Sequence, residues 1–97
     1  MLYHVTLTHP IESCPLFHPE LRDRVREAGP RLQQAAADLG VTVHFDVTAA
    51  PAHRSFLLIE TDDYTALQRY LALLPLQYEF DIVPVVPQSG ATKTLFP

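Results

Sequence analysis

The chain is expected to fold as an α+β domain of the ferredoxin-like type, in which a four-stranded antiparallel sheet carries two helices on one face. Four segments show the alternation or the short apolar run of strands, namely residues 2–8, 41–47, 55–61 and 78–86. Two longer segments, 19–40 and 61–75, space their apolar residues as helices do. The resulting order is βαββαβ, which two right-handed crossovers arrange as a single sheet.

Strand alternation places a set of polar side chains on one side of this sheet. In the first strand, Tyr3, Val5 and Leu7 share one face, and the other carries His4, Thr6 and Thr8. In the second, Val41, Val43, Phe45 and Val47 share the apolar face, and the polar one carries Thr42, His44 and Asp46. The third strand places Glu60 beside His4 if Leu57 and Ile59 face the helices. The first and third strands are central neighbours in this topology, so His4 and Glu60 are expected within one or two cross-strand positions.

The first helix is expected to begin at Pro19 and to end at Gly40. Its buried stripe is Leu21, Val25, Ala28, Leu32, Ala35 or Ala36, and Leu39. Pro30 interrupts that stripe and lacks an amide donor, so a kink or a restart is expected there. The second helix opens with the capping types Thr61 and Asp62 and stops before Pro75.

The last strand contains Pro84, which predicts an edge position or a bulge because proline cannot donate to a ladder. Residues 1–86 are therefore expected to form the domain, and residues 87–97 a C-terminal tail. The tail ends in the apolar pair Leu95 and Phe96. Two large apolar side chains at the end of a polar tail predict docking on a neighbouring subunit.

Composition narrows the class of protein. The chain has 97 residues, a formal net charge of −4 and only seven Lys and Arg residues, which argues against nucleic acid and anionic membranes as partners. No apolar run reaches the roughly 20 residues of a membrane span, and the N-terminus does not read as a signal peptide. Cys14 is the single cysteine, which fits a reducing compartment. A cytoplasmic location is expected.

The apolar fraction, 47%, is high for so short a chain and predicts an interface between subunits. Both helices cover one face of the predicted sheet, so the other face needs a partner. A second subunit is expected to meet that face with its own, enclosing a cavity in the manner of a dimeric α/β barrel. In this arrangement His4 lines the cavity.

The polar side chains on that face, His4, His44, Asp46 and Glu60, are the types that proton transfer uses. The alternative is that they are solvated or locally hydrogen-bonded positions on an open sheet. His53 and Arg54, in the loop between the second and third strands, either contact an anionic substrate or form a solvated turn.

Metal sites are weaker interpretations. Two histidines and a carboxylate of the polar face could form a facial site. His9, Cys14 and His18 have a spacing compatible with a metal in the first loop, although zinc sites favour tighter pairs, so a proline-rich loop with incidental ligand types is preferred. No metal and no cofactor are expected.

Three segments resemble the muconolactone Δ-isomerases: "MLYHVTLT" their first strand, "RLQQAAADLG" the end of their first helix and "LPLQYEFDIVPV" their passage into the last strand. Together they cover about a third of the chain. "FLLIETDD" and "FDIVPV" are equally similar to a family of small dimeric α/β-barrel proteins. Both resemblances imply the ferredoxin-like fold and assembly into oligomers.

The isomerase resemblance implies a cofactor-free double-bond shift in a small carboxylated lactone, and carries over His4 with its motif intact. The family's acidic positions in the first helix and its arginine in the second strand are not matched here, where Glu27 is displaced and Asp46 lies near the family's cation. The expected catalytic pair is His4 and Glu60, with His44, Asp46 and Arg54 binding substrate. The alternative is a non-catalytic small-ligand-binding or assembly protein of the barrel group.

Overall fold

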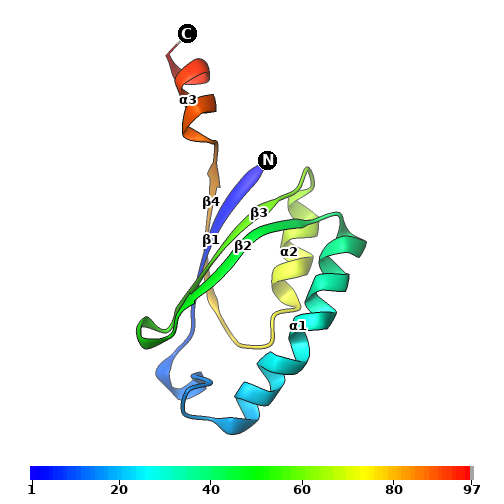
Figure 1. Cartoon of the computed structure of the whole chain (residues 1–97), viewed down its shortest axis with the longest axis vertical. Coiled ribbons are helices and arrows are strands. Elements are labelled where there is room, and N and C mark those ends of the chain that lie inside the picture. The colour runs from blue at the N-terminus through cyan, green and yellow to red at the C-terminus, as the bar shows by residue number, and fades with distance from the viewer. Residues whose placement is uncertain (97) are drawn as a thin grey trace.

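The computed structural model describes residues 1–96 and has the expected architecture. Its main elements are β1 (Leu2–Thr8), α1 (Pro19–Leu39), β2 (Thr42–Ala49), β3 (Arg54–Glu60), α2 (Tyr64–Ala72), β4 (Glu79–Val85) and α3 (Gln88–Leu95). Short 3₁₀ turns, η1 (Ile11–Ser13) and η2 (Ala50–Ala52), follow β1 and β2. The strands form one antiparallel sheet in the order β2-β3-β1-β4, and α1 and α2 cover one face of it (Figure 1). The ferredoxin-like α+β prediction is confirmed.

The core lies between this covered face and the two helices. Val5 and Ile59 from the central strands and Leu67 from α2 are completely buried there. The same cluster contains Tyr70 of α2 and Ala36 of α1. Leu57 and Ile59 therefore face the helices, as the alternation predicts, and His4 and Glu60 face the other way. We call this uncovered side of the sheet the open face.

α1 begins and ends at the expected residues. Pro19 stands in its first turn, and Gly40 closes it in the left-handed conformation with φ 71°, where a side chain would be strained. The helix runs through Pro30 without interruption, so of the two predicted alternatives the restart is wrong, and the kink stays a prediction. α2 is capped by the Asp63 carboxylate, which accepts from the Thr65 amide at 2.9 Å, one position later than the expected capping types. No helix in residues 1–96 is both long and apolar enough to cross a membrane.

β2 does not keep the alternation that its sequence shows. A bulge between Val43 and Phe45 leaves His44 out of the pairing register, so Val43 lies opposite Ile59 but Phe45 lies opposite Leu58. From Phe45 onward the strand's faces are therefore exchanged. Asp46, expected beside His44 on the open face, instead lies opposite Leu57 on the helix-covered side. Phe45 and Val47 take the exposed positions.

β4 is an edge strand, as Pro84 predicts. The segment after it differs from the expected tail, because residues Gln88–Leu95 form the helix α3. In Figure 1 this helix extends beyond the end of the sheet, well clear of α1 and α2. Leu95 and Phe96 are largely exposed at its end, with 65% and 77% of their surface accessible. Pro97, the last residue of the predicted tail, lies outside the described residues.

Candidate functional site

The open face brings together two of the residues that the sequence analysis selected. The Nε2 atom of His44, at the bulge of β2, lies 2.7 Å from Oε1 of Glu60, at the end of β3. Both side chains are exposed, so water competes with this contact and screens it. The bulge explains this contact. It leaves His44 without a partner in the ladder, near Glu60 at the end of β3.

His4 lies near the middle of the open face and has aromatic rather than acidic neighbours. The centroid of its ring lies 6.2 Å from that of the Phe45 ring, in an edge-on arrangement, and 6.1 Å from that of the Phe56 ring. The residue opposite it on β3 is Leu58, and Glu60 lies two positions farther along β3, opposite Leu2, within the predicted one or two cross-strand positions of His4. Within the chain the hydrogen-bond partner of Glu60 is nevertheless His44 and not His4.

Arg54 begins β3 and Glu60 ends it, so the two residues are about 20 Å apart along the strand. The structure thus places the Arg54 guanidinium outside any site that His44 and Glu60 form in the same chain. Its backbone carbonyl accepts from the Thr48 hydroxyl at 3.2 Å, which ties the ends of β2 and β3 together.

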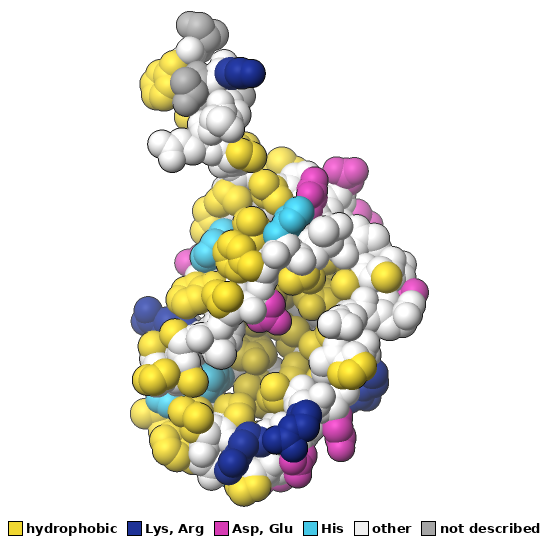
Figure 2. Space-filling model, in the orientation of Figure 1, with side chains coloured by type: hydrophobic (Ala, Val, Ile, Leu, Met, Phe, Trp, Pro, Cys, Tyr) yellow, Lys and Arg dark blue, Asp and Glu magenta, His cyan; other side chains and the backbone are white. Residues whose placement is uncertain are grey.

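The opposite side of the sheet contains a cavity of about 410 Å³, which we call the helix-side cavity. Its walls come from α1, from the sheet and from the loops that follow β1 and α2. Most of the lining is apolar, with Leu7, Val25, Leu32, Leu57, Leu74 and Leu76 among its side chains. Figure 2 shows the hollow between the sheet and α1, with hydrophobic side chains in its depth. The size and lining are those of a small-molecule site.

Asp46 supplies the carboxylate of this cavity. Its side chain lies exposed at the rim, and no hydrogen-bond donor or cation pairs with it among the described residues. The surrounding apolar walls withdraw water from the charged form and raise the pKa of Asp46 above its ordinary value of 3.8. A second hollow of about 510 Å³, lined by His44 and Tyr70 among others, shares Asp46 with the cavity.

Tyr78 lines the helix-side cavity close enough to Asp46 to respond to its charge. Burial and the negative charge of Asp46 together raise the pKa of Tyr78 to about 12. Its phenol is therefore protonated at neutral pH and can donate a hydrogen bond into the cavity. The same two causes raise the pKa of Tyr70. A base beside a phenolic donor is an arrangement that can remove a proton next to a carbonyl group.

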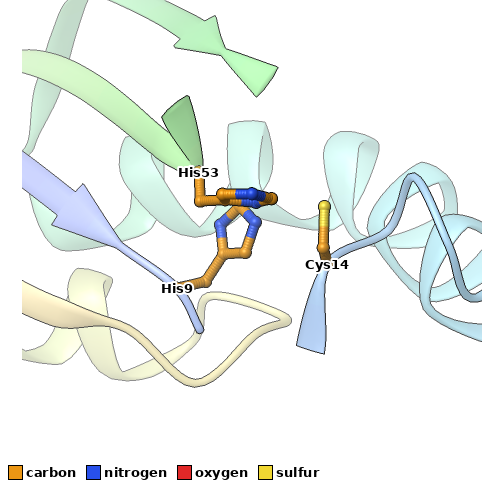
Figure 3. Close-up of side chains that lie close together, drawn as sticks. All are labelled: His9, Cys14 and His53. Atoms are coloured by element: carbon orange, nitrogen blue, oxygen red, sulfur yellow. The ribbon is translucent and has the colours of Figure 1, made fainter. Parts of the chain in front are cut away.

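A third cluster lies at the end of this cavity, where β1 leaves the sheet. His9, Cys14 and His53 present ligand-type atoms that all lie within 4.8 Å of one another. Figure 3 shows the two imidazoles edge to face, with the cysteine side chain from the neighbouring loop beside them. Burial and the neighbouring His53 lower the pKa of His9. His18, the third residue of the metal site considered in the sequence analysis, lies elsewhere: its Nδ1 atom is 3.7 Å from Oε1 of Glu20 at the start of α1.

Sequence reasoning did not select Tyr78 or the helix-side cavity. The sequence pattern predicts Tyr78 as the first residue of the last strand, whereas β4 begins one residue later, at Glu79. The signal that could have drawn attention to the cavity is the proline-rich loop after β1, which cannot pack as a regular element and forms part of the cavity wall.

Comparison with known proteins identifies the family of the chain. A family model described as "Domain of unknown function (DUF3303)" matches residues 1–96. Among the curated proteins, none matches the chain.

Proposed function

The chain belongs to the DUF3303 family, and we propose that it is an acid/base enzyme that shifts a proton on a small carbonyl compound held in the helix-side cavity. The observation that carries this proposal is Asp46, an unpaired carboxylate with a raised pKa at the rim of a largely apolar cavity. Perturbed carboxylates in such surroundings are typical of catalytic acids and bases.

The roles follow from the protonation states. The Asp46 carboxylate accepts the acidic proton beside the substrate carbonyl and returns it one position along, which is an isomerisation. The protonated Tyr78 phenol donates to the carbonyl oxygen as negative charge develops on it. Arg22, also on the lining, offers a planar fork to a substrate carboxylate. The resemblance to the muconolactone isomerases supports the same class of reaction.

A screen of small lactones and keto acids tests this function. A compound that occupies the cavity at 100 times its Kd is expected to stabilise the fold by about 2.7 kcal/mol, which a thermal-shift assay detects. The bound compound should then exchange its acidic proton in deuterated water, followed by NMR, faster than it does without protein. Binding without any acceleration of exchange would leave a ligand-binding protein and remove the catalytic role.

The alternative function, a non-catalytic assembly or ligand-binding protein, is favoured by the open face. One row across all four strands reads Phe45, Leu58, His4 and Val83. Phe45 and Val83 remain exposed in this row, as does Val47 nearby on β2. Apolar surface of this extent on one side of a sheet is typical of a protein interface.

We propose that a second copy of the chain covers the open face. The row of Phe45, Leu58, His4 and Val83 crosses the middle of the sheet. Glu60 and Glu79 stand at the ends of their strands on the same face, and Asp81 lies beside Val83 on β4, so a second copy would meet the apolar row with its own across a two-fold axis. The exposed Leu95, the last residue of α3, and Phe96 after it would then contact the same neighbour. In such an assembly His4 and the His44–Glu60 pair would line the interface, and catalysis by His4 and Glu60 remains a prediction.

Light scattering is expected to show at least a dimer at micromolar concentration. Val83→Arg places a charge in the apolar row and should shift the protein towards monomer. The matched control is Leu73→Arg, which changes an exposed leucine at the end of α2 and should leave the mass unchanged. A wild-type monomer, or equal effects of both variants, would contradict the assembly.

A further inference from the structure

The loop after β1 meets the β2–β3 connection, and the side chains at this contact have no role in the proposed proton transfer. His9 follows β1, and its amide donates to the His53 carbonyl at 3.1 Å, which holds the two segments together. Cys14 follows the η1 turn and is 1% exposed, while His9 is 7% exposed. Two imidazoles and one thiol from separate segments thus converge in a buried place (Figure 3).

The imidazoles of this cluster lack hydrogen-bond partners. Both ring nitrogens of His9 and Nδ1 of His53 are buried and make no hydrogen bond with any residue in 1–96. Buried polar atoms are normally paired, so three unpaired nitrogens in one place require an explanation. A cation bound between the rings would take one nitrogen from each of them.

The backbone supports the same conclusion. His53 has φ 56°, the one described residue other than glycine with a positive value. This left-handed conformation is costly for a residue with a side chain and persists where the surrounding structure requires it. Here it ends the η2 turn and brings the His53 ring to 5.3 Å from the His9 ring, nearly perpendicular to it. A glycine would make the turn without strain but would supply no ring.

We propose that His9, Cys14 and His53 bind a zinc ion. Imidazole nitrogen and thiolate sulfur are the ligands that Zn²⁺ prefers in proteins. With Zn–N of about 2.0–2.1 Å and Zn–S of about 2.3 Å, ligands of a tetrahedral site lie roughly 3.3–3.6 Å apart. Atoms that already lie within 4.8 Å of one another reach this spacing by side-chain rotation.

The cluster supplies three protein ligands and leaves the fourth position free. His9 and Cys14 both line the helix-side cavity, so that position faces the space where a small molecule would bind. Three protein ligands with one open position distinguish catalytic zinc sites from closed structural ones. This proposal differs from the sequence-based expectation of no metal, because His53, and not His18, completes the cluster with His9 and Cys14.

Metal titration of the full-length chain tests the site. After removal of metals with a chelator, the wild-type protein is expected to bind one Zn²⁺ per chain in isothermal titration calorimetry, and Zn²⁺ should raise its melting temperature. Co²⁺ added in place of Zn²⁺ should give the intense near-ultraviolet absorption of a cobalt–thiolate bond. Substoichiometric binding, or cobalt binding without that absorption, would overturn the assignment.

Three variants separate these ligands from incidental binding. Cys14→Ala and His53→Gly are expected to weaken Zn²⁺ binding by at least about 100-fold, since loss of residues that merely support metal ligands already costs 10- to 100-fold. His53→Gly relieves the positive φ, so it should fold without strain. His18→Ala, the matched control, should bind Zn²⁺ as the wild type does. Binding that survives both ligand variants, or an equal loss in His18→Ala, would overturn the site.

Zinc binding and the proton-transfer proposal can fail separately. Asp46→Asn is expected to retain the calorimetric zinc signal, because Asp46 is not among the clustered ligands. Zinc binding without catalysis would leave the metal site standing, and catalysis by a chain that binds no zinc would remove the metal site alone.

Discussion

Asp46→Asn is expected to slow proton transfer by about 10²- to 10⁴-fold while the protein remains folded, because the amide keeps the shape of the carboxyl group but cannot accept the proton. The measurement is the rate of proton exchange, in deuterated water, of the compound identified by thermal shift. The effect should appear in the rate at saturating ligand, with little change in ligand affinity.

The control for this variant is Glu60→Gln, which removes a carboxylate from the open face. If the helix-side cavity carries the reaction, Glu60→Gln and His4→Ala retain exchange. The reverse pattern, with loss in these two variants and retention in Asp46→Asn, would place the reaction on the open face and contradict the cavity assignment. The two faces of one sheet are thereby tested in the same assay.

Asp46→Asn also has an expected signature in stability. The pKa of Asp46 in the folded chain lies above its ordinary value of 3.8, so between these two values the folded state holds more protons than the unfolded state. The contribution of Asp46 to stability therefore falls as the pH rises through that window. Asparagine carries no charge that burial would destabilise. The variant should therefore melt at a higher temperature than wild type at pH 7, and this difference should disappear near pH 3.

Asp38→Asn is the matched control for the stability measurement. Asp38 is exposed on α1 and accepts from the Gln34 amide, a bond that asparagine can still accept. It reports what the loss of one exposed carboxylate does to the melting temperature at the two pH values. A pH-independent difference between Asp46→Asn and wild type would contradict the link between burial at the cavity rim and the raised pKa.

Leu67→Ala is expected to cost about 2–5 kcal/mol of unfolding free energy. Leu67 is completely buried where α2 packs on the sheet, so the shorter side chain loses its transfer energy and leaves a cavity. Domains of this size have roughly 5–15 kcal/mol of stability in total, so the loss is a large share of it. Urea denaturation followed by circular dichroism measures the change.

The matched control is Leu73→Ala, the same substitution at an exposed residue that caps α2. It should change the unfolding free energy by no more than about 0.5 kcal/mol. Similar losses in both variants would mean that the core does not lie between α2 and the covered face of the sheet.

Local patterns were sufficient for most of the fold because each depends on neighbouring residues only. The alternation of Tyr3, Val5 and Leu7 predicts a strand with one buried face, and the structure buries all three. Gly40 predicts the end of α1 because a residue without a side chain enters the left-handed region most easily. Pro84 predicts the edge strand because it lacks the donor that a central ladder needs.

The candidate sites depended on packing that no local pattern contains. The two-residue period of β2 runs unbroken through the sequence, yet the bulge leaves His44 out of the ladder and so moves Asp46 to the covered side. After the bulge, Phe45 of β2 pairs with Leu58 of β3 on the open face. The register of β2 therefore depends on a residue from another strand.

By itself, therefore, the sequence determined the order and type of the main elements from β1 to β4, the face of β1 that carries His4, and the presence of acid/base and ligand-type residues. The tertiary structure alone decided which of them meet. Spacing along the chain suggested His18 as the companion of His9 and Cys14, but the start of α1 carries His18 to Glu20, and the antiparallel pairing of β1 with β3 brings His53 alongside His9. Chain separation does not measure distance once strands pair, because a hydrogen-bonded ladder joins residues regardless of how many others lie between them.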